Sequence, residues 1–442
     1  MRPPLPRSAD AAEPRTRLWR TLAWPAAIAS GWLGWYVGES LRHRREDRVG
    51  YELPAPQPPS GPAFRAAAEA LVGTQASAGN QIELLVNGDR IFPSILEAMR
   101  GAERTLSLET YVWWRGEIAD ELAAAICERA RAGVECRVLL DAVGSLKMRP
   151  ELVDEMRASG ARVVRFRPPR LHLLNRTTNR SHRRVIVIDG RIGFTGGAGI
   201  AAEWTGDAEN PDHWRDTHVR VEGPAVRALQ GAFGQHWIET TGETFAGTDL
   251  FGDLQEGEDG ETIQIVRSGA TVGDTNVEVL YFLAIASAER SIALTAAYFA
   301  PRPPFVEALR DAAERGVRVR ILVPGSHIDK QFVRRAGRRV YEQLLAGGVE
   351  IHEYQPTMLH AKSMVVDGCW ASIGTVNFDN RSFQLHDELT LCAYGGRVPD
   401  ELTEVFELDL AHSERIDPDR WRERGRLQRA GELLTVPFRR EL

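Results

Sequence analysis

Apolar and polar positions follow two different periods that alternate along most of the chain. Residues 119–132 and 304–315 carry apolar side chains at helical spacing, whereas residues 134–140 and 317–323 alternate as strands do. Strands that alternate with helices indicate an α/β fold, in which helices cover a sheet. The pattern predicts strand, helix, strand, helix, strand twice over, each time followed by a further strand and its hairpin partner.

The two predicted units repeat one another in sequence as well as in pattern. Residues 103–108 (ERTLSL) match residues 289–294 (ERSIAL), and residues 131–140 match residues 315–323 once one position is skipped. A repeat of this length indicates two copies of one structural unit. We divide the chain into an N-terminal tail (1–20), a hydrophobic segment (21–38), a proline-rich linker with a leading helix (39–78), a first repeat (79–245), a linker (246–260), a second repeat (261–412) and a basic amphipathic C-terminal segment (413–442).

The hydrophobic segment, residues 21–38, has no charged side chain and is flanked by arginines on both sides. A bilayer core needs about 20 apolar residues, and tryptophans near the ends suit the membrane interface. The segment therefore predicts a single N-terminal transmembrane anchor. A cleaved signal peptide and a helix lying on the membrane surface are the alternatives. Arginines are almost equally frequent on the two sides, so the orientation stays open.

The amino-acid composition limits the kinds of molecule that the chain is expected to bind. Hydrophobic residues make up 43% of the chain and charged residues 26%, as in ordinary folded proteins, and the formal net charge is −6. That balance argues against a generally basic nucleic-acid binder. Arginines between residues 162 and 184 form either a local surface for anionic phosphates or a solvated charged face. The four cysteines are scattered, so we expect no metal site and no disulfide framework.

A motif of histidine, cation and aspartate occurs once in each repeat. His360, Lys362 and Asp367 lie in residues 359–368 (LHAKSMVVDG), and residues 181–190 (SHRRVIVIDG) hold a second copy. In that copy the corresponding residues are His182, Arg184 and Asp189. Two histidines brought together can divide the work on one phosphodiester, because one attacks phosphorus while the other protonates the leaving oxygen.

The parity of the motif assigns its parts. Residues two apart share a face of a strand, so each histidine and its cation, Arg184 or Lys362, point into one site. Asp189 and Asp367 have the opposite parity and precede glycines, which predicts turn residues that shape hairpins. Two other carboxylates are candidates to orient the imidazoles: Asp216, which follows His182 in its repeat, and Glu388, which follows His360. A surface or capping position is the alternative for either acid.

These segments resemble the phospholipase D superfamily and, within it, the bacterial cardiolipin synthases. The resemblance covers roughly residues 81–442. It rests on residues 109–113 (ETYVW), 181–190, 196–197, 214–223 (WRDTHVRVEG), 298–301 (YFAP), 360–367 and 374–383 (GTVNFDNRSF). It implies two similar phospholipase D-like halves, each a mixed β-sheet flanked by helices, with one active site at their interface. It also implies chemistry without metal or cofactor, through a phosphohistidine, in a bacterial cell membrane.

The resemblance carries over residue by residue. It implies that His182 is the nucleophile and that His360 is the acid and later the base. Lys362, Arg184 and Asn377 would hold phosphate oxygens, with Gly197 and Thr375 beside the substrate. Asp216 and Glu388 would orient the histidines, and Asp189 and Asp367 would be structural. The first repeat departs from the family pattern at three positions: Ser181, Arg184 and Gly199.

Three functions follow as alternatives. The first is transfer of a phosphatidyl group between two phosphatidylglycerols at a membrane, with anionic phospholipids as partners. The second is phosphodiester hydrolysis of phospholipid or, less in keeping with residues 21–38, of nucleic acid. The third is a non-catalytic membrane scaffold, suggested by Arg184 and Gly199. The oligomeric state is left open.

Overall fold

The computed structural model describes residues 30–32, 34, 50–169, 179–252, 257, 259–270, 274–425, 432 and 435. The chain forms two units, Met1–Val49 and Gly50–Leu442. In the first unit residues 30–32 and 34 are helical, and the rest of the predicted anchor, residues 21–38, lies outside the described residues. Among the helices that are described, none combines the length and the apolar character that crossing a bilayer requires.

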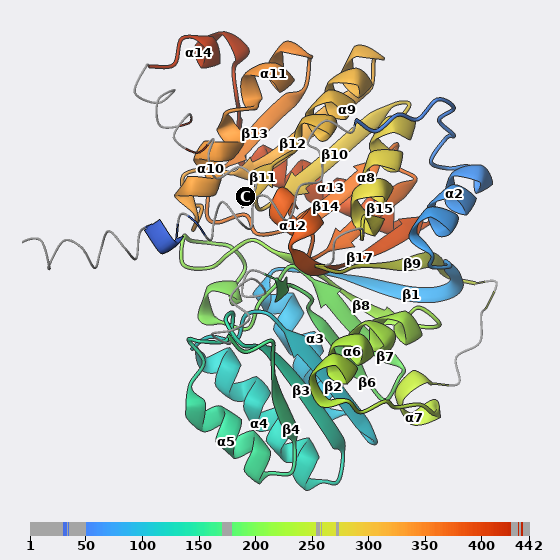
Figure 1. The fold of residues 1–442 in the computed structure, drawn as a ribbon, viewed down its shortest axis with the longest axis vertical. Helices are drawn as coiled ribbons and strands as arrows, with labels where there is room; N and C mark the ends of the chain where they lie inside the picture. Colours follow the sequence, from blue (N-terminus) through green and yellow to red (C-terminus); the bar gives the residue numbers. More distant parts are fainter. Residues whose placement is uncertain are drawn as a thin grey trace, which may run out of the picture. The chain divides into compact units, whose positions relative to one another are not determined.

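The second unit is built on one mixed sheet of 16 strands. Fifteen of them follow the order β18-β13-β12-β10-β14-β15-β17-β9-β1-β8-β7-β6-β2-β3-β4, and β5 pairs with β17 off this path. Figure 1 shows β13 and β4 near opposite ends of the sheet. The first-repeat strands are β1 (Ser77–Val86), β2 (Thr105–Thr110), β3 (Glu135–Asp141), β4 (Arg162–Phe166), β5 (Arg180–Ser181), β6 (Val185–Ile188), β7 (Ile192–Gly196) and β8 (Thr217–Glu222). The second-repeat strands are β9 (Glu261–Ser268), β10 (Ser291–Ala296), β12 (Arg318–Pro324), β13 (Glu350–Tyr354), β14 (Lys362–Val366), β15 (Trp370–Gly374), β17 (His386–Tyr394) and β18 (Ser413–Arg415), with a separate pair of β11 (Phe299–Ala300) and β16 (Phe378–Asp379).

The repeat seen in the sequence reappears in the strand pairing. β2, β3 and β4 are parallel neighbours, and β6 is antiparallel to β2. β10, β12 and β13 are parallel in the same way, and β14 is antiparallel to β10. The two sets are joined through β9, which pairs with both β17 and β1. The mixed α/β fold predicted from the alternating periods is therefore confirmed.

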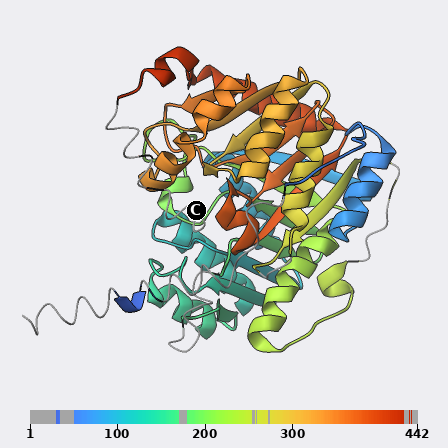
Figure 2. The same cartoon turned by 45° about the horizontal axis from the view of Figure 1, so that its top comes forward.

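Helices cover both faces of this sheet. The leading helix is α2 (Pro62–Val72), and the first-repeat helices are α3 (Gly88–Arg100), α4 (Glu117–Arg131), α5 (Pro150–Ala158), the 3₁₀ turn η2 (Ala202–Trp204) and α6 (Val226–Thr241). The linker holds α7 (Thr248–Phe251). The second-repeat helices are α8 (Asn276–Ser287), α9 (Pro303–Glu314), α10 (Gln331–Arg338), α11 (Tyr341–Ala346), α12 (Asn380–Gln384) and α13 (Arg397–Ala411), and α14 (Pro418–Arg422) lies in the C-terminal segment. α8 and α9 lie side by side in both views (Figures 1 and 2).

Helix α4 shows why these segments fold as they do. Ile118, Leu122 and Ile126 recur at helical spacing and are buried, so they turn one face of the helix toward the sheet. Acidic residues stand in its first turn and arginines in its last turn, where they complement the helix dipole. Its bounds lie within two residues of the predicted span.

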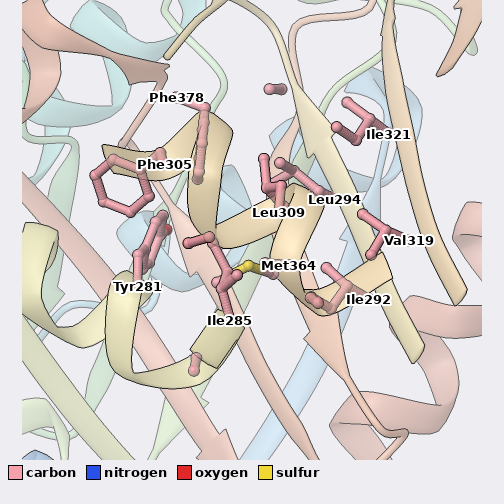
Figure 3. Close-up of a cluster of buried hydrophobic side chains, with 14 of the residues drawn as sticks. Tyr281, Ile285, Ile292, Leu294, Phe305, Leu309, Val319, Ile321, Met364 and Phe378 are labelled. Atoms are coloured by element: carbon pink, nitrogen blue, oxygen red, sulfur yellow. The ribbon is translucent and has the colours of Figure 1, made fainter. Parts of the chain in front are cut away.

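The hydrophobic core lies on both sides of the sheet. One cluster packs α8 and α9 onto the second repeat, and Figure 3 shows Ile285, Leu309 and Met364 within it. A second cluster packs α3 and α4 onto the first repeat. A third unites α6 and α13 with strands of both repeats. Each fully buried side chain of this size contributes about 1.5–3 kcal/mol, so the shared cluster holds the two repeats together.

The C-terminal segment contributes to this body where it is described. β18 pairs antiparallel with β13, and α14 follows it. Trp421 of α14 is buried against Tyr341, with ring centroids 5.3 Å apart, and the guanidinium groups of Arg338 and Arg424 lie over its indole. The described part of the C-terminal segment up to α14 therefore packs on the body.

Candidate active site

His182 lies between β5 and β6 and is almost completely buried. Its backbone N–H donates to Asp387 O at 2.9 Å, next to the parallel pairing of β5 with β17. Its Nδ1 is 2.9 and 3.0 Å from the two oxygens of Glu388. A carboxylate only accepts, so Nδ1 carries the hydrogen and Nε2 keeps its lone pair. The imidazole is fixed in one tautomer.

His360 stands just before β14 and is equally buried. Its backbone N–H donates to Arg215 O at 2.7 Å, beside a short bridge between Arg215 and Leu359. Its Nδ1 lies 2.6 Å from Asp216 Oδ2. The second imidazole therefore has the same tautomer and the same kind of support as the first.

The two carboxylates are exchanged between the repeats. Separation along the chain pairs Asp216 with His182 and Glu388 with His360, but the structure pairs Glu388 with His182 and Asp216 with His360. That expected pairing is wrong for a physical reason. Each histidine is held by backbone bonds to the other repeat, so its side chain reaches the carboxylate of that repeat. Each half-site is completed by the opposite half.

Both carboxylates are themselves held in place. Asp216 accepts from Trp204 Nε1 at 2.8 Å and from the Thr217 backbone N–H at 2.7 Å. Gly197 packs directly against this carboxylate, which a Cβ at that position would strike. The Thr375 hydroxyl donates to Glu388. The contacts observed for Gly197 and Thr375, two residues expected beside the substrate, are thus with the orienting acids.

A cation accompanies each histidine. Arg184 Nη1 donates to His182 O at 2.8 Å, and Arg184 Nη2 lies 3.3 Å from His182 Nε2. Lys362 Nζ donates to His360 O and lies 2.9 Å from His360 Nδ1 and 3.1 Å from His360 Nε2. Each cation thus stands against the imidazole of its own histidine, within 3.3 Å of Nε2. An anionic phosphate at Nε2 would be held by charge-assisted hydrogen bonds.

Burial and these charges set the ionisation of the site. Burial, with Arg184 and Lys362, holds the pKa of His182 well below its usual value. Burial and Lys362 lower the pKa of His360 to about 4. Burial raises the pKa of Asp216, but His360 and Lys362 outweigh it and the pKa falls to about 2. Both imidazoles are therefore neutral near pH 7, opposite an ionised carboxylate at Asp216.

The two half-sites also share an electrostatic environment. Positive charge on His360 or Lys362 lowers the pKa of His182, and Arg184 lowers the pKa of His360. Burial lowers the pKa of Lys362 to about 7, with Arg184 adding to the effect and Asp216 opposing it. The ionisation of each half-site therefore depends on charged groups of the other.

Asn377 and the two motif aspartates occupy distinct places. Asn377 is buried, and its Oδ1 has no hydrogen-bond partner among the described residues, which suits a ligand-facing amide. Asp189 and Asp367 adopt positive φ of 51° and 55° in the turns after β6 and β14. Each accepts three backbone N–H bonds at the start of the neighbouring strand, from residues 103–105 or 289–291.

Aromatic side chains outside the two histidine motifs line the two imidazoles. Trp204 and Trp214 lie 5.1 and 5.6 Å from the His360 ring, between centroids. Tyr111 and His386 each lie 5.3 Å from the His182 ring. These side chains lie in aromatic or acidic stretches of the sequence, such as residues 109–114, and that position is the sequence feature that could have identified them. Periodicity alone describes such residues as core.

One group within the described part of the chain has metal-ligand geometry. His182, His386 and Glu388 bring ligand atoms within 4.8 Å of one another. The donors are already engaged, since His182 Nδ1 bonds Glu388 and Arg381 Nε donates to His386 Nε2 at 3.1 Å. The guanidinium of Arg184 stands 3.3 Å from His182. These positive charges oppose a metal cation, so the residues do not fit a metal centre.

Comparisons with known proteins agree with this geometry. A family model described as cardiolipin synthase, PLD-like domain, matches residues 281–410. The cardiolipin synthase of Geobacillus kaustophilus is 39% identical over 352 residues, which are 79% of this chain and 70% of that protein. The cardiolipin synthase of Halalkalibacterium halodurans is 37% identical over 362 residues, 81% of this chain and 71% of that protein.

A solved structure extends the comparison to the fold. The crystal structure of phosphatidylserine synthase from Haemophilus influenzae Rd KW20 matches with a TM-score of 0.64 over 85% of this chain and 97% of its own, at 14% identity. The fold and the duplicated histidine motif are thus those of phospholipase D-like proteins. Within that class, the chain belongs to the cardiolipin synthase family.

Proposed function

We propose that this protein is a phosphatidyltransferase that converts two phosphatidylglycerols into cardiolipin and glycerol. The observation that carries the proposal is the crosswise pair of imidazoles, His182 on Glu388 and His360 on Asp216, with a cation beside each. The similarity to cardiolipin synthases supports the choice of lipid substrates. Anionic phosphates suit a site that holds Arg184 and Lys362.

The first chemical step uses the free Nε2 of His182. This lone pair attacks the phosphorus of one phosphatidylglycerol, and the bond from phosphorus to the glycerol headgroup breaks. Protonated His360 gives its proton to the departing glycerol oxygen, while Arg184 and Lys362 offset the charge on the phosphoryl oxygens. The imidazole of His360 is neutral in the resting enzyme. We therefore infer that binding of the anionic phosphate raises the pKa of His360 and so favours its protonated form. The product is a phosphatidyl–His182 intermediate.

The second step reverses these roles. His360 takes the proton from a glycerol hydroxyl of a second phosphatidylglycerol, and the resulting oxygen attacks the same phosphorus. The bond between phosphorus and His182 breaks and cardiolipin leaves. Asp216 and Glu388 stabilise the imidazolium that each histidine forms in turn. The buried surroundings of both rings keep competing water away from the intermediate.

Labelled phosphatidylglycerol in detergent micelles tests this proposal against its alternatives. Cardiolipin and free glycerol in equal amounts are the expected products. Phosphatidic acid with glycerol would instead identify a hydrolase, and no turnover would identify a scaffold. His182→Ala and His360→Ala supply the matched controls, and we expect each to remove turnover.

We also propose that residues 21–38 anchor the enzyme in a bacterial membrane. The support is the 18-residue run without a charged side chain, flanked by arginines and close to the minimum length for a span. Removing residues 1–49 leaves the unit Gly50–Leu442. We expect that truncation to move the protein from the membrane pellet to the supernatant. Micellar turnover by the truncated enzyme serves as the folding control. A truncated protein that still sediments with membranes would contradict the anchor.

A further inference from the structure

The two half-sites are unequal in a way that the internal repeat makes visible. The hairpin β6–β7 corresponds to β14–β15, which aligns Arg184 with Lys362 two positions after each histidine. It also aligns Gly199 with Asn377, each three residues beyond the glycine that ends β7 or β15. The second half therefore offers a lysine and an amide, and the first offers an arginine and no side chain. The first half therefore differs from the second at two aligned positions, Arg184 and Gly199, and one structural reason should explain both differences.

Arg184 offers as many hydrogen-bond donors as Lys362 and Asn377 offer together. Arginine has five N–H donors, whereas lysine has three and the asparagine amide two. Arg184 Nη1 donates to His182 O as Lys362 donates to His360 O, so one donor is used equivalently in each half. Arg184 Nε is buried and has no partner among the residues described. After this bond, the N–H donors left on Arg184 are as many as those left on Lys362 and Asn377 together, and the positive charge is the same in both halves.

The space around Gly199 is shaped to this arrangement. A Cβ at that position would lie 2.8 Å from Val112 Cβ and 3.1 Å from the Trp204 ring. Those distances are too short for an unmoved side chain. Trp204 is also the residue whose Nε1 donates to Asp216, the acid that orients His360. A side chain at 199 would therefore disturb the opposite half-site.

A small cavity of about 20 Å³ adjoins the same residues. Arg184, Gly199 and His218 line it, together with apolar side chains from α3, β2 and β6. Its volume suffices for one water molecule, which needs roughly 10–15 Å³. The cavity thus lies beside Arg184, whose Nε is buried and has no hydrogen-bond partner among the described residues.

We propose that Arg184 alone supplies, in the first half, the phosphate contacts that Lys362 and Asn377 supply together in the second. Gly199 completes the exchange by leaving Trp204 where its Nε1 donates to Asp216. The phosphoryl group is then held by a planar fork on the His182 side and by a point charge with an amide on the His360 side. This inference rests on the proposed phosphatidyl transfer.

The test compares one substitution in two settings, with glycerol release from phosphatidylglycerol in micelles as the rate. In the natural chain, Arg184→Lys should lower the rate on the order of tenfold to a hundredfold, as loss of one or two charge-assisted bonds does. In a chain carrying Gly199→Asn and Val112→Ala, which restores the amide and makes room for it, the same Arg184→Lys change should raise the rate. Inorganic phosphate serves as a competitive probe, and its inhibition constant should follow the same reversal.

The outcomes separate the inference from the function on which it rests. Absence of glycerol release from the natural enzyme would contradict phosphatidyl transfer itself. An active natural enzyme in which Arg184→Lys has no effect, or the same effect in both settings, overturns the inference. Arg191→Lys, at an exposed turn position, is the matched control and should leave the rate unchanged. Thermal unfolding of each variant identifies any loss caused by misfolding, and the Arg184→Lys single variant decides the matter if the crowded variants do not fold.

Discussion

The buried side chains of the site differ from free amino acids in the protons they carry. Burial, with Lys362, lowers the pKa of His360 to about 4, and burial lowers the pKa of Lys362 to about 7. Near neutral pH the site therefore holds neutral imidazoles and a lysine whose lowered pKa lies close to that pH.

This ionisation predicts an alkaline limit to activity. As the pH rises through about 7, Lys362 loses the charge that holds the phosphate, so kcat/KM should fall above that pH. His182 attacks in its neutral form, and its lowered pKa places any acid limb well below pH 6.5. Lys362→Arg should remove the alkaline limb, because a guanidinium stays protonated there. An unchanged limb in that variant would show that another group titrates.

The exchanged carboxylates predict selective effects on the two imidazoles. Glu388→Gln should shift the ¹⁵N resonance of His182 Nδ1 and leave that of His360 in place, since Glu388 bonds only the first of these rings. Asp216→Asn should do the reverse. Each substitution should also lower kcat by a factor on the order of 10²–10⁴, as removal of an orienting carboxylate does. Resonance shifts that follow the chain separation instead would contradict the crossed pairing.

The sequence indicates which residues form the site, but not which carboxylate contacts which histidine. His182, His360 and their cations are recognisable because a duplicated motif repeats residue types at fixed offsets, whereas the two acids were candidates because each follows the hairpin of its own repeat. The crossed pairing was missed because Asp216 and Glu388 reach their histidines across the boundary between repeats, over 144 and 206 positions. Chain separation carries no information about such contacts.

Among the secondary-structure elements, the hairpins β6–β7 and β14–β15 depend on their turn aspartates. Asp367 accepts backbone N–H bonds from Glu289, Arg290 and Ser291 at 2.9, 2.7 and 2.8 Å. These bonds join the end of β14 to the start of β10, its antiparallel neighbour. Asp189 does the same for β6 and β2. The acids thus stabilise the strands that lead from the histidines.

Removing either aspartate should therefore lower the stability of the fold rather than act directly on the catalytic step. Asp367→Ala and Asp189→Ala each leave three N–H groups without their acceptor and place alanine at positive φ, which we expect to reduce the unfolding free energy by roughly 2–4 kcal/mol. Thermal and urea denaturation would measure the loss. His360→Ala is the contrast, with turnover removed and Tm nearly unchanged. A stable but inactive Asp367→Ala protein would instead assign the carboxylate a chemical part.

Long periodic elements were predictable, and short contacts between repeats were not. α4 and α9 follow from helical spacing, and β3 and β12 from alternation within apolar runs. β5 spans two residues and pairs with β17 of the other repeat. Two residues show no period, so nothing in the local sequence marks them as a strand. That pairing is nevertheless what places His182 beside Glu388.

Across the whole molecule, the two repeats form one continuous sheet and one site. β9 pairs with strands on both sides of it, and the core between α6 and α13 draws side chains from both halves. The duplicated sequence predicted two similar halves, but not that each would complete the histidine of the other. Each histidine therefore depends on a carboxylate of the opposite repeat, Glu388 for His182 and Asp216 for His360.

Trapping the covalent intermediate tests this central claim most directly. Phosphatidylglycerol labelled with ³²P, mixed with the natural enzyme and quenched in denaturant, should leave label on the peptide that contains His182. The bond should be labile to acid and stable to base, as a phosphoramidate is. His182→Ala should abolish the label. Turnover without any labelled histidine, or label that persists in the His182→Ala enzyme, would contradict an attack by His182 assisted from the opposite half by His360.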